Sequence, residues 1–275
     1  MAPTHKYTVT AYLAAIFMDF FSACTTIAAS VTDAITPLVG TEEGGTYVCM
    51  GADGTPTKLI DKVAEDIIIA YLKEFGLCQN LISEEIGKAD IGGTSGTIYL
   101  DPVDGTYNAI MAIPFYALSI AYAENGQILK AFVQNLASGE VFTAEKGQGA
   151  FLNGCPIHVS STSGLHSSAM SIYGKHFEQG RIFHLMQKIR RFRQFGASAL
   201  EISYVAAGRI DGFVDLRNTL RVTDAAAGVL ICEEAGGMVT DIRGSMIRFA
   251  DEVTLGTCLI ATNGSLHRKV IEYIR

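Results

Sequence analysis

Two aspartates three residues apart, Asp101 and Asp104, are the pair whose type and spacing most clearly indicate chemistry. They lie in the run Leu-Asp-Pro-Val-Asp-Gly-Thr at residues 100–106, where a bend at Pro102 lets both carboxylates converge on one point. The carbonyl oxygen of Val103 can face the same point. Carboxylate and carbonyl oxygens are hard ligands that suit Mg²⁺ or Mn²⁺ better than zinc. This run therefore predicts a divalent-metal site.

Gly105 and Thr106 follow these aspartates at the expected start of a helix. Their backbone N–H groups would bind an anion there, because the first turn of a helix has unpaired donors and the positive end of the helix dipole. Acids that bind a metal beside amides that bind an anion are the parts of a phosphate-ester site. The alternative is an acidic turn in which Asp104 only caps the helix. The complete run favours the phosphate-ester site.

The overall composition limits the possible partners and compartments. The chain has 275 residues, of which 49% are hydrophobic, so it can build one large domain or two closely packed ones. Its formal charge of −7 argues against a nucleic-acid surface. The cysteines form no C-x-x-C pair and the histidines show no zinc spacing, so we expect reduced thiols, a cytoplasmic protein and no zinc site.

The apolar spacing predicts the elements that must position the site. Before residue 160 we expect helices at 11–31 and 57–75, a strand or hairpin at 46–51, strands at 80–83 and 97–100, and an antiparallel meander over 115–159 with Asn-Gly turns. After residue 160 we expect alternating strands and helices: 169–173, 181–191, 197–207, 212–215, 224–235, 238–241, 258–262 and a final helix capped by Ser265. Because Pro102 donates no hydrogen bond, we expect the inner strand to end before it.

This order predicts a mixed α/β protein. Residues 1–160 would form a mainly antiparallel α+β subdomain that carries most of the metal-binding acids. Residues 161–275 would form an α/β subdomain that completes the site. The apolar run 11–31 contains Asp19 and has helical spacing, so we interpret it as a buried helix rather than a membrane segment or leader.

Residues 101–106, Asp-Pro-Val-Asp-Gly-Thr, resemble the DP(I/V)DGT signature of the inositol monophosphatase superfamily of lithium-sensitive, metal-dependent sugar phosphatases. Residues 147–154 resemble the G-x-G-A-x-x-N-G turn of that family, and residues 223–228, Thr-Asp-Ala-Ala-Ala-Gly, resemble its W-D-x-A-A-G signature. Thr223 replaces the tryptophan, which shifts the resemblance toward the archaeal branch that hydrolyses both fructose 1,6-bisphosphate and inositol 1-phosphate. The resemblance covers nearly the whole chain and implies a layered αβαβα sandwich.

The resemblance also implies two or three Mg²⁺ ions per site, for which Mn²⁺ can substitute. The ligands of the first ion would be Glu84, Asp101 and the Val103 carbonyl. The second ion would be held by Asp101, Asp104 and Asp224, and a weaker third ion by Glu84 with Asp61 nearby. From the residues alone, the pattern favours a solvated strand end for Glu84 and a plain helix cap for Asp224. Asp61 fits a charge that favours the helix dipole as well as it fits an acid aimed into the site.

The chemistry implied by the family is in-line hydrolysis by a metal-activated water, without a covalent enzyme intermediate. Thr106, Glu84 and Asp61 would act on that water, and the amides of Gly105 and Thr106 would bind the phosphate. Three alternatives stay open. The first is an aspartyl-phosphate hydrolase, although its D-x-D-G-T motif has one residue between the acids and this chain has two. The second is a 3'(2'),5'-bisphosphate nucleotidase of the same superfamily. The third is a non-catalytic protein that senses metal or phosphate.

Substrate recognition is the remaining sequence hypothesis. Clustered arginines usually face solvent, but in an acidic chain Arg191 and Arg193 could receive a second phosphate, because guanidinium pairs bidentately with phosphate oxygens. We group Tyr173 and Ser198 with them as substrate-binding residues. Asp215 resembles the family's acid that takes a substrate hydroxyl. We expect a small sugar or polyol phosphate as the partner, no nucleic acid, no membrane, and the homodimer that the family implies.

Overall fold

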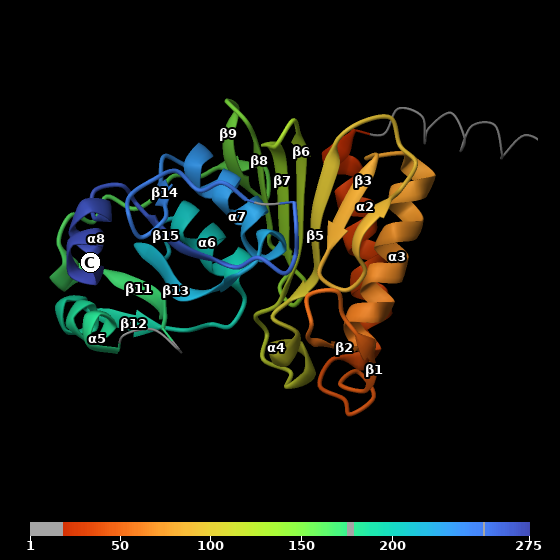
Figure 1. Ribbon diagram of the computed structural model, residues 1–275, viewed down its shortest axis with the longest axis horizontal. Helices are drawn as coiled ribbons and strands as arrows, with labels where there is room; N and C mark the ends of the chain where they lie inside the picture. Colours follow the sequence, from red (N-terminus) through yellow and green to blue (C-terminus); the bar gives the residue numbers. More distant parts are fainter. Residues whose placement is uncertain (1–18, 175–178, 250) are drawn as a thin grey trace, which may run out of the picture.

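The computed structural model describes residues 19–174, 179–249 and 251–275. Within them, helices and sheets alternate in five layers (Figure 1). Helices α2 (Phe20–Ile35) and α3 (Leu59–Phe75) cover one face of the first sheet, and α6 (Ser198–Ala206) and α7 (Val222–Glu234) lie between the two sheets. The outer face of the second sheet is covered by α5 (Gln179–Lys188) and α8 (His267–Ile274). The predicted αβαβα sandwich is confirmed.

The first sheet contains eight strands among the described residues, in the order β10-β9-β8-β7-β6-β5-β3-β4. Their bounds are β3 (Asn80–Ser83), β4 (Gly87–Asp90), β5 (Thr97–Asp104), β6 (Ala117–Glu124), β7 (Gln127–Asn135), β8 (Val141–Glu145), β9 (Gly149–Leu152) and β10 (Cys155–Pro156). Strands β3 and β5 are parallel, and the other pairs are antiparallel. The predicted meander is therefore present. Asn125 and Gly126 both have positive φ, as a tight hairpin turn of right-handed strands requires.

Strand β5 corrects one prediction. We expected the strand to end before Pro102, but it runs to Asp104 between β3 and β6. The register with β6 shifts between Asp101 and Asp104, so Pro102 falls in an irregular stretch of the ladder where its missing N–H breaks no regular pair. The next residue, Gly105, has a φ of 91° and leads from the strand into the short helix α4 (Thr106–Ile110).

The second sheet combines parallel and antiparallel pairs in the order β12-β11-β13-β15-β14. Its strands are β11 (Ala169–Tyr173), β12 (Arg191–Arg193), β13 (Gly212–Leu220), β14 (Met238–Thr240) and β15 (Thr257–Thr262). Strand β11 is parallel to β12 and β13, while β15 is antiparallel to β13 and β14.

Several predicted boundaries in this part are wrong. The strand expected at 212–215 is β13, which runs on to Leu220. Arg191 was expected at the end of a helix and lies in β12, because α5 ends at Lys188. Ser265 was expected to cap the last helix, which instead begins after Leu266 without a side-chain cap.

The N-terminal helices also begin later than the sequence pattern indicated. Asp19 was placed inside the first helix, but it is the N-cap of α2, and its Oδ1 accepts the N–H of Phe21 over 3.0 Å. The expected residues 11–18 lie outside the described part. Helix α3 buries Ile60, Ala64, Ile68 and Leu72, whereas its apolar residues Val63, Ile67 and Tyr71 are only partly buried.

The two sheets share one hydrophobic core, because α7 packs on β6 and β7 of the first sheet and on β14 of the second. This shared core does not test the predicted division into subdomains at residues 1–160 and 161–275, which stays a prediction. In α7, Gly228 lets α6 approach closely, since a Cβ there would lie 2.9 Å from the Cβ of Ile202. No helix in the described ranges is both long and apolar enough to span a membrane.

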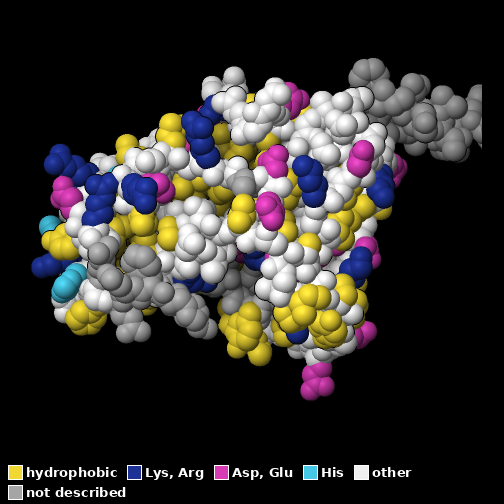
Figure 2. All heavy atoms as spheres, viewed as in Figure 1, with side chains coloured by type: hydrophobic (Ala, Val, Ile, Leu, Met, Phe, Trp, Pro, Cys, Tyr) yellow, Lys and Arg dark blue, Asp and Glu magenta, His cyan; other side chains and the backbone are white. Residues whose placement is uncertain are grey.

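The surface carries an apolar patch around the hairpin of β1 (Tyr47–Met50) and β2 (Pro56–Lys58) and around α4 (Figure 2). We call it the hairpin patch. Its exposed side chains are Tyr47, Val48, Met50, Tyr107, Met111 and Ile113. Short 3₁₀ turns at Thr36–Leu38 and Leu165–Ser167 complete the regular structure of the described residues.

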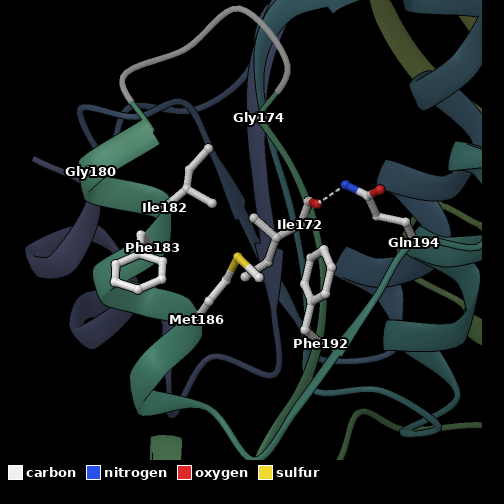
Figure 3. A pocket seen from close by; sticks show the side chains of 8 residues that line it. All are labelled: Ile172, Gly174, Gly180, Ile182, Phe183, Met186, Phe192 and Gln194. Atoms are coloured by element: carbon white, nitrogen blue, oxygen red, sulfur yellow. Dashed lines mark hydrogen bonds between the residues drawn. The ribbon is translucent and has the colours of Figure 1, made fainter.

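A separate apolar pocket of about 540 Å³ lies between α5 and the strands β11 and β12 (Figure 3). Its wall includes Phe183, Met186 and Phe192, and the side chain of Gln194 donates to the carbonyl of Ile172 over 2.7 Å. The described side chains of its wall carry no charge, so this pocket does not offer the groups that a phosphate ester needs.

Candidate active site

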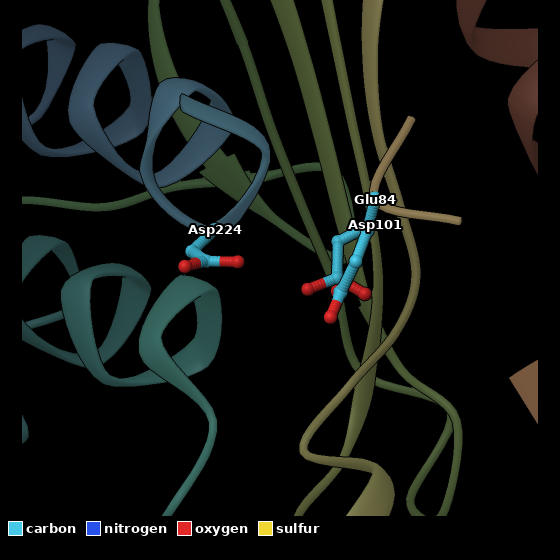
Figure 4. A group of neighbouring side chains, drawn as sticks. All are labelled: Glu84, Asp101 and Asp224. Atoms are coloured by element: carbon cyan, nitrogen blue, oxygen red, sulfur yellow. The ribbon is translucent and has the colours of Figure 1, made fainter. Parts of the chain in front are cut away.

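Three carboxylates that are far apart in the sequence meet in one place. Glu84 follows β3, Asp101 lies in β5, and Asp224 lies in the first turn of α7. Each offers one oxygen atom, and these three atoms lie within 4.8 Å of one another. Figure 4 shows Asp224 facing the other two acids across the gap between α7 and the sheet. They converge because β3 and β5 are parallel, so that the carboxyl ends of both strands reach the same edge.

These acids line a pocket of about 240 Å³. The other residues of its wall are Val103, Asp104, Gly105, Thr106, Tyr173, Gly196, Ser198, Arg217 and Arg221. The pocket thus contains the predicted metal ligands Glu84, Asp101, Val103, Asp104 and Asp224. It also contains the predicted phosphate-binding residues Gly105 and Thr106.

Asp104 lies in this wall and also caps a helix. Its Oδ1 accepts the N–H of Ser198 over 3.0 Å, and its Oδ2 accepts the N–H of Ala199 over 2.6 Å. These donors belong to the first turn of α6, which has no side-chain cap of its own. The carboxylate therefore fixes α6 against the metal-binding edge of the sheet. The sequence had suggested Asp104 as a possible cap for the helix that follows it, but the helix it caps is 94 residues further along.

Asp61 and Thr106 form a hydrogen-bonded pair beside the pocket. The Thr106 hydroxyl lies 2.8 Å from Asp61 Oδ1 and 3.1 Å from the Val103 carbonyl. Asp61 is only 4% exposed, and its other oxygen accepts the N–H of Lys58 at the start of α3 over 3.2 Å. Burial raises the pKa of Asp61 to about 7, against the lowering effect of the Thr106 hydrogen bond.

Arg221 is a cation within the acidic cluster. Its Nη1 lies 2.6 Å from Glu84 Oε1, its Nη2 lies 3.0 Å from Asp224 Oδ1, and it also pairs with Asp53 in the turn between β1 and β2. Burial works against the charge of Arg221, but Asp224 and Glu84 outweigh it and raise the pKa of the guanidinium. Arg221 is the residue before α7, and its backbone N–H donates to Asp224 over 3.0 Å.

Of the predicted substrate residues, Tyr173 and Ser198 line the pocket and Asp215 does not. Asp215 is fully buried, and its Oδ2 lies 2.5 Å from Nη2 of Arg217. Arg217 in turn lies over the ring of Tyr173, with its guanidinium carbon 4.4 Å from the ring centre. Asp215 thus does not face the pocket itself but holds Arg217, which does.

Arg191 and Arg193 are exposed on β12 and are not among the described residues that line the pocket. Their guanidinium groups donate to the carbonyls of Arg190 and Phe192 over 3.0 and 2.8 Å. The chain after β12 nevertheless leads directly to the pocket wall at Gly196.

The acidic cluster fits a divalent cation. Burial raises the pKa of Glu84 to about 8, although Arg221 lowers it. Burial also raises the pKa values of Asp101 and Asp104 well above their usual range, and repulsion from the neighbouring acids adds to this effect. Buried carboxylates that repel one another are stabilised by a nearby positive charge, and their oxygens are the donors that Mg²⁺ and Mn²⁺ prefer.

These shifts predict how the stability of the metal-free protein depends on pH. A carboxyl group whose pKa is higher in the folded protein than in the unfolded chain stabilises the fold at low pH, and this contribution is lost as the pH rises through the folded value. For Glu84 the window runs from 4.5 to about 8. We expect the melting temperature of the chelator-treated protein to fall from pH 5 to pH 8, and millimolar Mg²⁺ to reduce that fall. A melting temperature that rises steadily over this range would contradict the prediction.

The layered fold and this acidic pocket together define a phosphoric monoester hydrolase of the metal-dependent sugar-phosphatase class. The chain belongs to the inositol monophosphatase family, whose model matches residues 17–275. The family is metal-dependent, and the cluster of Glu84, Asp101 and Asp224 could hold a metal ion. The resemblance noted from the sequence is confirmed, as is the prediction of a phosphomonoester hydrolase.

Known relatives agree with this assignment. A Methanothermobacter thermautotrophicus protein named fructose-1,6-bisphosphatase/inositol-1-monophosphatase is 46% identical over 262 residues, which cover 90% of this chain and 93% of that protein. A Methanococcus maripaludis protein named bifunctional NADP phosphatase/NAD kinase is 37% identical, and the match covers 92% of this chain but only 49% of the relative. A solved inositol monophosphatase–fructose 1,6-bisphosphatase superposes with a TM-score of 0.87 at 31% identity and covers 94% of this chain and 100% of its own.

Sequence reasoning missed Arg217, Arg221, Gly196 and Asp53. The spacing R-x-x-D before α7 was a usable signal for Arg221, since a residue at the N-cap lies next to the third helical residue. Arg217 follows Asp215 by two residues in a strand, which places both side chains on one face. Asp53 gave no signal, because its partner is 168 residues away.

Proposed function

We propose that this protein is a Mg²⁺-dependent phosphatase that hydrolyses a small sugar or polyol phosphate monoester, with fructose 1,6-bisphosphate and inositol 1-phosphate as its substrates. The observation that carries the proposal is the approach of three distant carboxylates to within 4.8 Å at the wall of one pocket. The name of the Methanothermobacter thermautotrophicus relative supports this substrate class, because it contains both activities.

In this proposal the pocket holds two or three Mg²⁺ ions, for which Mn²⁺ can substitute. The first would be held by Glu84, Asp101 and the Val103 carbonyl. The second would be held by Asp101, Asp104 and Asp224, and a weaker third by Glu84 with Asp61 nearby. Bound divalent cations supply positive charge that polarises the phosphoryl group and lowers the pKa of a water.

The residues around the cations orient the water and the ester. Because the Thr106 hydroxyl donates to Asp61 Oδ1, its lone pairs are free to accept a hydrogen bond from a water in the pocket. Glu84 accepts a second hydrogen bond from the same water. The N–H groups of Gly105 and Thr106 bind the phosphate oxygens, so that the water attacks phosphorus in line with the departing sugar oxygen. No covalent enzyme intermediate is needed.

We further propose that Arg191 and Arg193 bind the second phosphate of a bisphosphate, while Tyr173 and Ser198 contact the sugar. Asp215 is fully buried and would act on the sugar through its ion pair with Arg217. The Arg191→Ala/Arg193→Ala double variant should raise KM for fructose 1,6-bisphosphate severalfold and leave inositol 1-phosphate hydrolysis unchanged, because the two side chains stand outside the metal pocket. Arg217→Ala should weaken the binding of both substrates, since Arg217 lines that pocket. Equal loss of both activities in the double variant would contradict the assignment of Arg191 and Arg193.

A substrate panel tests the proposed function. Released phosphate should be measured with fructose 1,6-bisphosphate, inositol 1-phosphate, adenosine 3',5'-bisphosphate and NADP, each with Mg²⁺ and with chelator. We expect Mg²⁺-dependent release from the first two. Release from the nucleotides alone would support the second candidate, a nucleotide phosphatase, which the NADP phosphatase named above favours. No release from any ester would support a metal or phosphate sensor, and a phospho-aspartate trapped with fluoroberyllate would support an aspartyl-phosphate mechanism.

We also propose a homodimer formed through the hairpin patch, and a cytoplasmic location. A contiguous exposed apolar patch often marks a contact between proteins, and the patch joins two segments that flank the pocket (Figure 2). All six cysteines lie in the described residues and are unpaired, which suits a reducing compartment. Sedimentation should give a dimer for the native chain and a monomer for Met111→Asp. A native monomer at micromolar concentration would contradict the proposal.

A further inference from the structure

Arg221 connects three acidic residues that come from three different elements. Its guanidinium contacts Asp53 in the β1–β2 turn, Glu84 after β3, and Asp224 at the start of α7. The Arg221 side chain is 21% exposed, whereas that of Asp53 is 2% exposed. These contacts are therefore largely shielded from water, and their electrostatic energy is larger than that of a surface ion pair.

The guanidinium lies between two groups that would hold a cation. Glu84 and Asp224 are two of the three acids whose oxygens lie within 4.8 Å of one another, and Arg221 touches both and lines the same pocket. A divalent cation bound by these two acids would lie close to the positive charge of Arg221. Like charges at close range repel one another strongly in a poorly hydrated site.

We propose that Arg221 is an internal counter-cation, which stabilises the carboxylates in the absence of metal and competes with a divalent cation for Glu84 and Asp224. The inference rests on the proposed metal site. Asp53 gives Arg221 a partner outside the group of clustered acids, so Arg221 can remain paired when Glu84 and Asp224 bind a metal.

The turn that carries Asp53 is already attached to the metal-binding strand end. The N–H of Ala52 donates to the carbonyl of Glu85 over 2.9 Å, and the N–H of Asp53 donates to the carbonyl of Glu84 over 3.3 Å. Asp53 is thus held beside Glu84 by the backbone and does not depend on Arg221 for its position. Arginine suits this role because its planar fork can pair with several carboxylates at once and keeps its charge at any physiological pH.

The experiment compares Mn²⁺ affinity and thermal stability in Arg221→Gln and in a matched control, Arg217→Gln. Both variants remove one positive charge from the pocket wall, but only Arg221 contacts Glu84 and Asp224. Mn²⁺ binding is measured by electron paramagnetic resonance, and melting temperature is measured with chelator and with saturating Mn²⁺.

For Arg221→Gln we expect a lower melting temperature with chelator, a larger rise on adding Mn²⁺, and Mn²⁺ affinity tighter by about tenfold, because juxtaposed like charges are costly. Arg217→Gln should stay within about twofold of the native affinity, since it lacks these contacts. If Arg221→Gln does not fold, Arg221→Lys replaces it, and we expect a smaller change in the same direction because lysine is a point charge that cannot bridge several acids.

Equal or weaker Mn²⁺ affinity in the Arg221 variants would overturn the inference, because Arg221 would then only position the ligands. Tighter binding of the same size in Arg217→Gln would also overturn it, because the effect would be one of net charge. Neither outcome would contradict the proposed function. The proposed function fails instead if the native protein shows no Mn²⁺ binding at millimolar concentration.

Discussion

Asp101→Asn should lower kcat/KM for inositol 1-phosphate by about a thousandfold or more, a loss of roughly 4 kcal/mol of transition-state stabilisation. Asp101 is 2% exposed, and its oxygen lies within 4.8 Å of those of both Glu84 and Asp224, so the proposed cations share it. Asparagine has nearly the same shape but lacks the charge that holds a divalent cation. The measurement is phosphate release at several Mg²⁺ concentrations.

The same substitution should not destabilise the metal-free protein. Burial and repulsion from Glu84, Asp104 and Asp224 raise the pKa of Asp101, so removing its charge relieves the cluster. Asp66→Asn is the matched control, because Asp66 is an exposed acid on α3 whose ion pair among the described residues is with Lys62, four residues before it. The control should keep native activity. Retention of more than about a tenth of the activity by Asp101→Asn would contradict the role of Asp101 as a metal ligand.

Thr106→Ala and Asp61→Asn should each reduce kcat by about a hundredfold to ten-thousandfold with little change in KM, which is the range for loss of a group that positions a proton transfer. The Thr106 hydroxyl donates to Asp61 Oδ1 over 2.8 Å, and the proposal places the attacking water on that hydroxyl. Orientation of the water matters in the transition state more than in substrate binding. Steady-state kinetics at saturating Mg²⁺ separate the two parameters.

Thr106→Ser serves as the control for this pair, because serine keeps the hydroxyl and should recover most of the native kcat. The double variant Thr106→Ala/Asp61→Asn should be no slower than the slower single variant, since the two residues act as one unit. Multiplicative losses would show that Asp61 acts independently of Thr106. A rise in KM without a fall in kcat would mean that both residues act in substrate binding and do not orient the water.

The order and type of the elements could be predicted because hydrophobic spacing and turn residues are local signals. The strands Asn80–Ser83 and Ala169–Tyr173 have the predicted bounds, as does the end of α3 at Phe75. The errors occurred where a distant partner decides the local structure. Pro102 stays within a strand because β6 pairs with Asp101 before it and with Asp104 after it, and the ladder is irregular between these two residues.

The meeting of the acids in one pocket could be anticipated only through the family resemblance of their short motifs, because no local pattern in the sequence predicts it. Asp101 and Asp104 are close in sequence, but Asp104 bonds to the first turn of α6, and Asp224 arrives from a helix that lies against the opposite face of the sheet from α3. Arg221 illustrates the limit most clearly. Its pairs with Asp53 and Glu84 join residues 168 and 137 positions apart, and neither partner carries a local sign of that contact.

The most direct test of the central claim is a crystal structure of the protein soaked in Mn²⁺, with anomalous diffraction used to locate the metal. The account predicts Mn²⁺ in the 240 Å³ pocket, with carboxylate oxygens of Glu84, Asp101 and Asp224 in its coordination sphere. A fully loaded crystal whose Mn²⁺ lies elsewhere, while this pocket shows no anomalous signal, would contradict it.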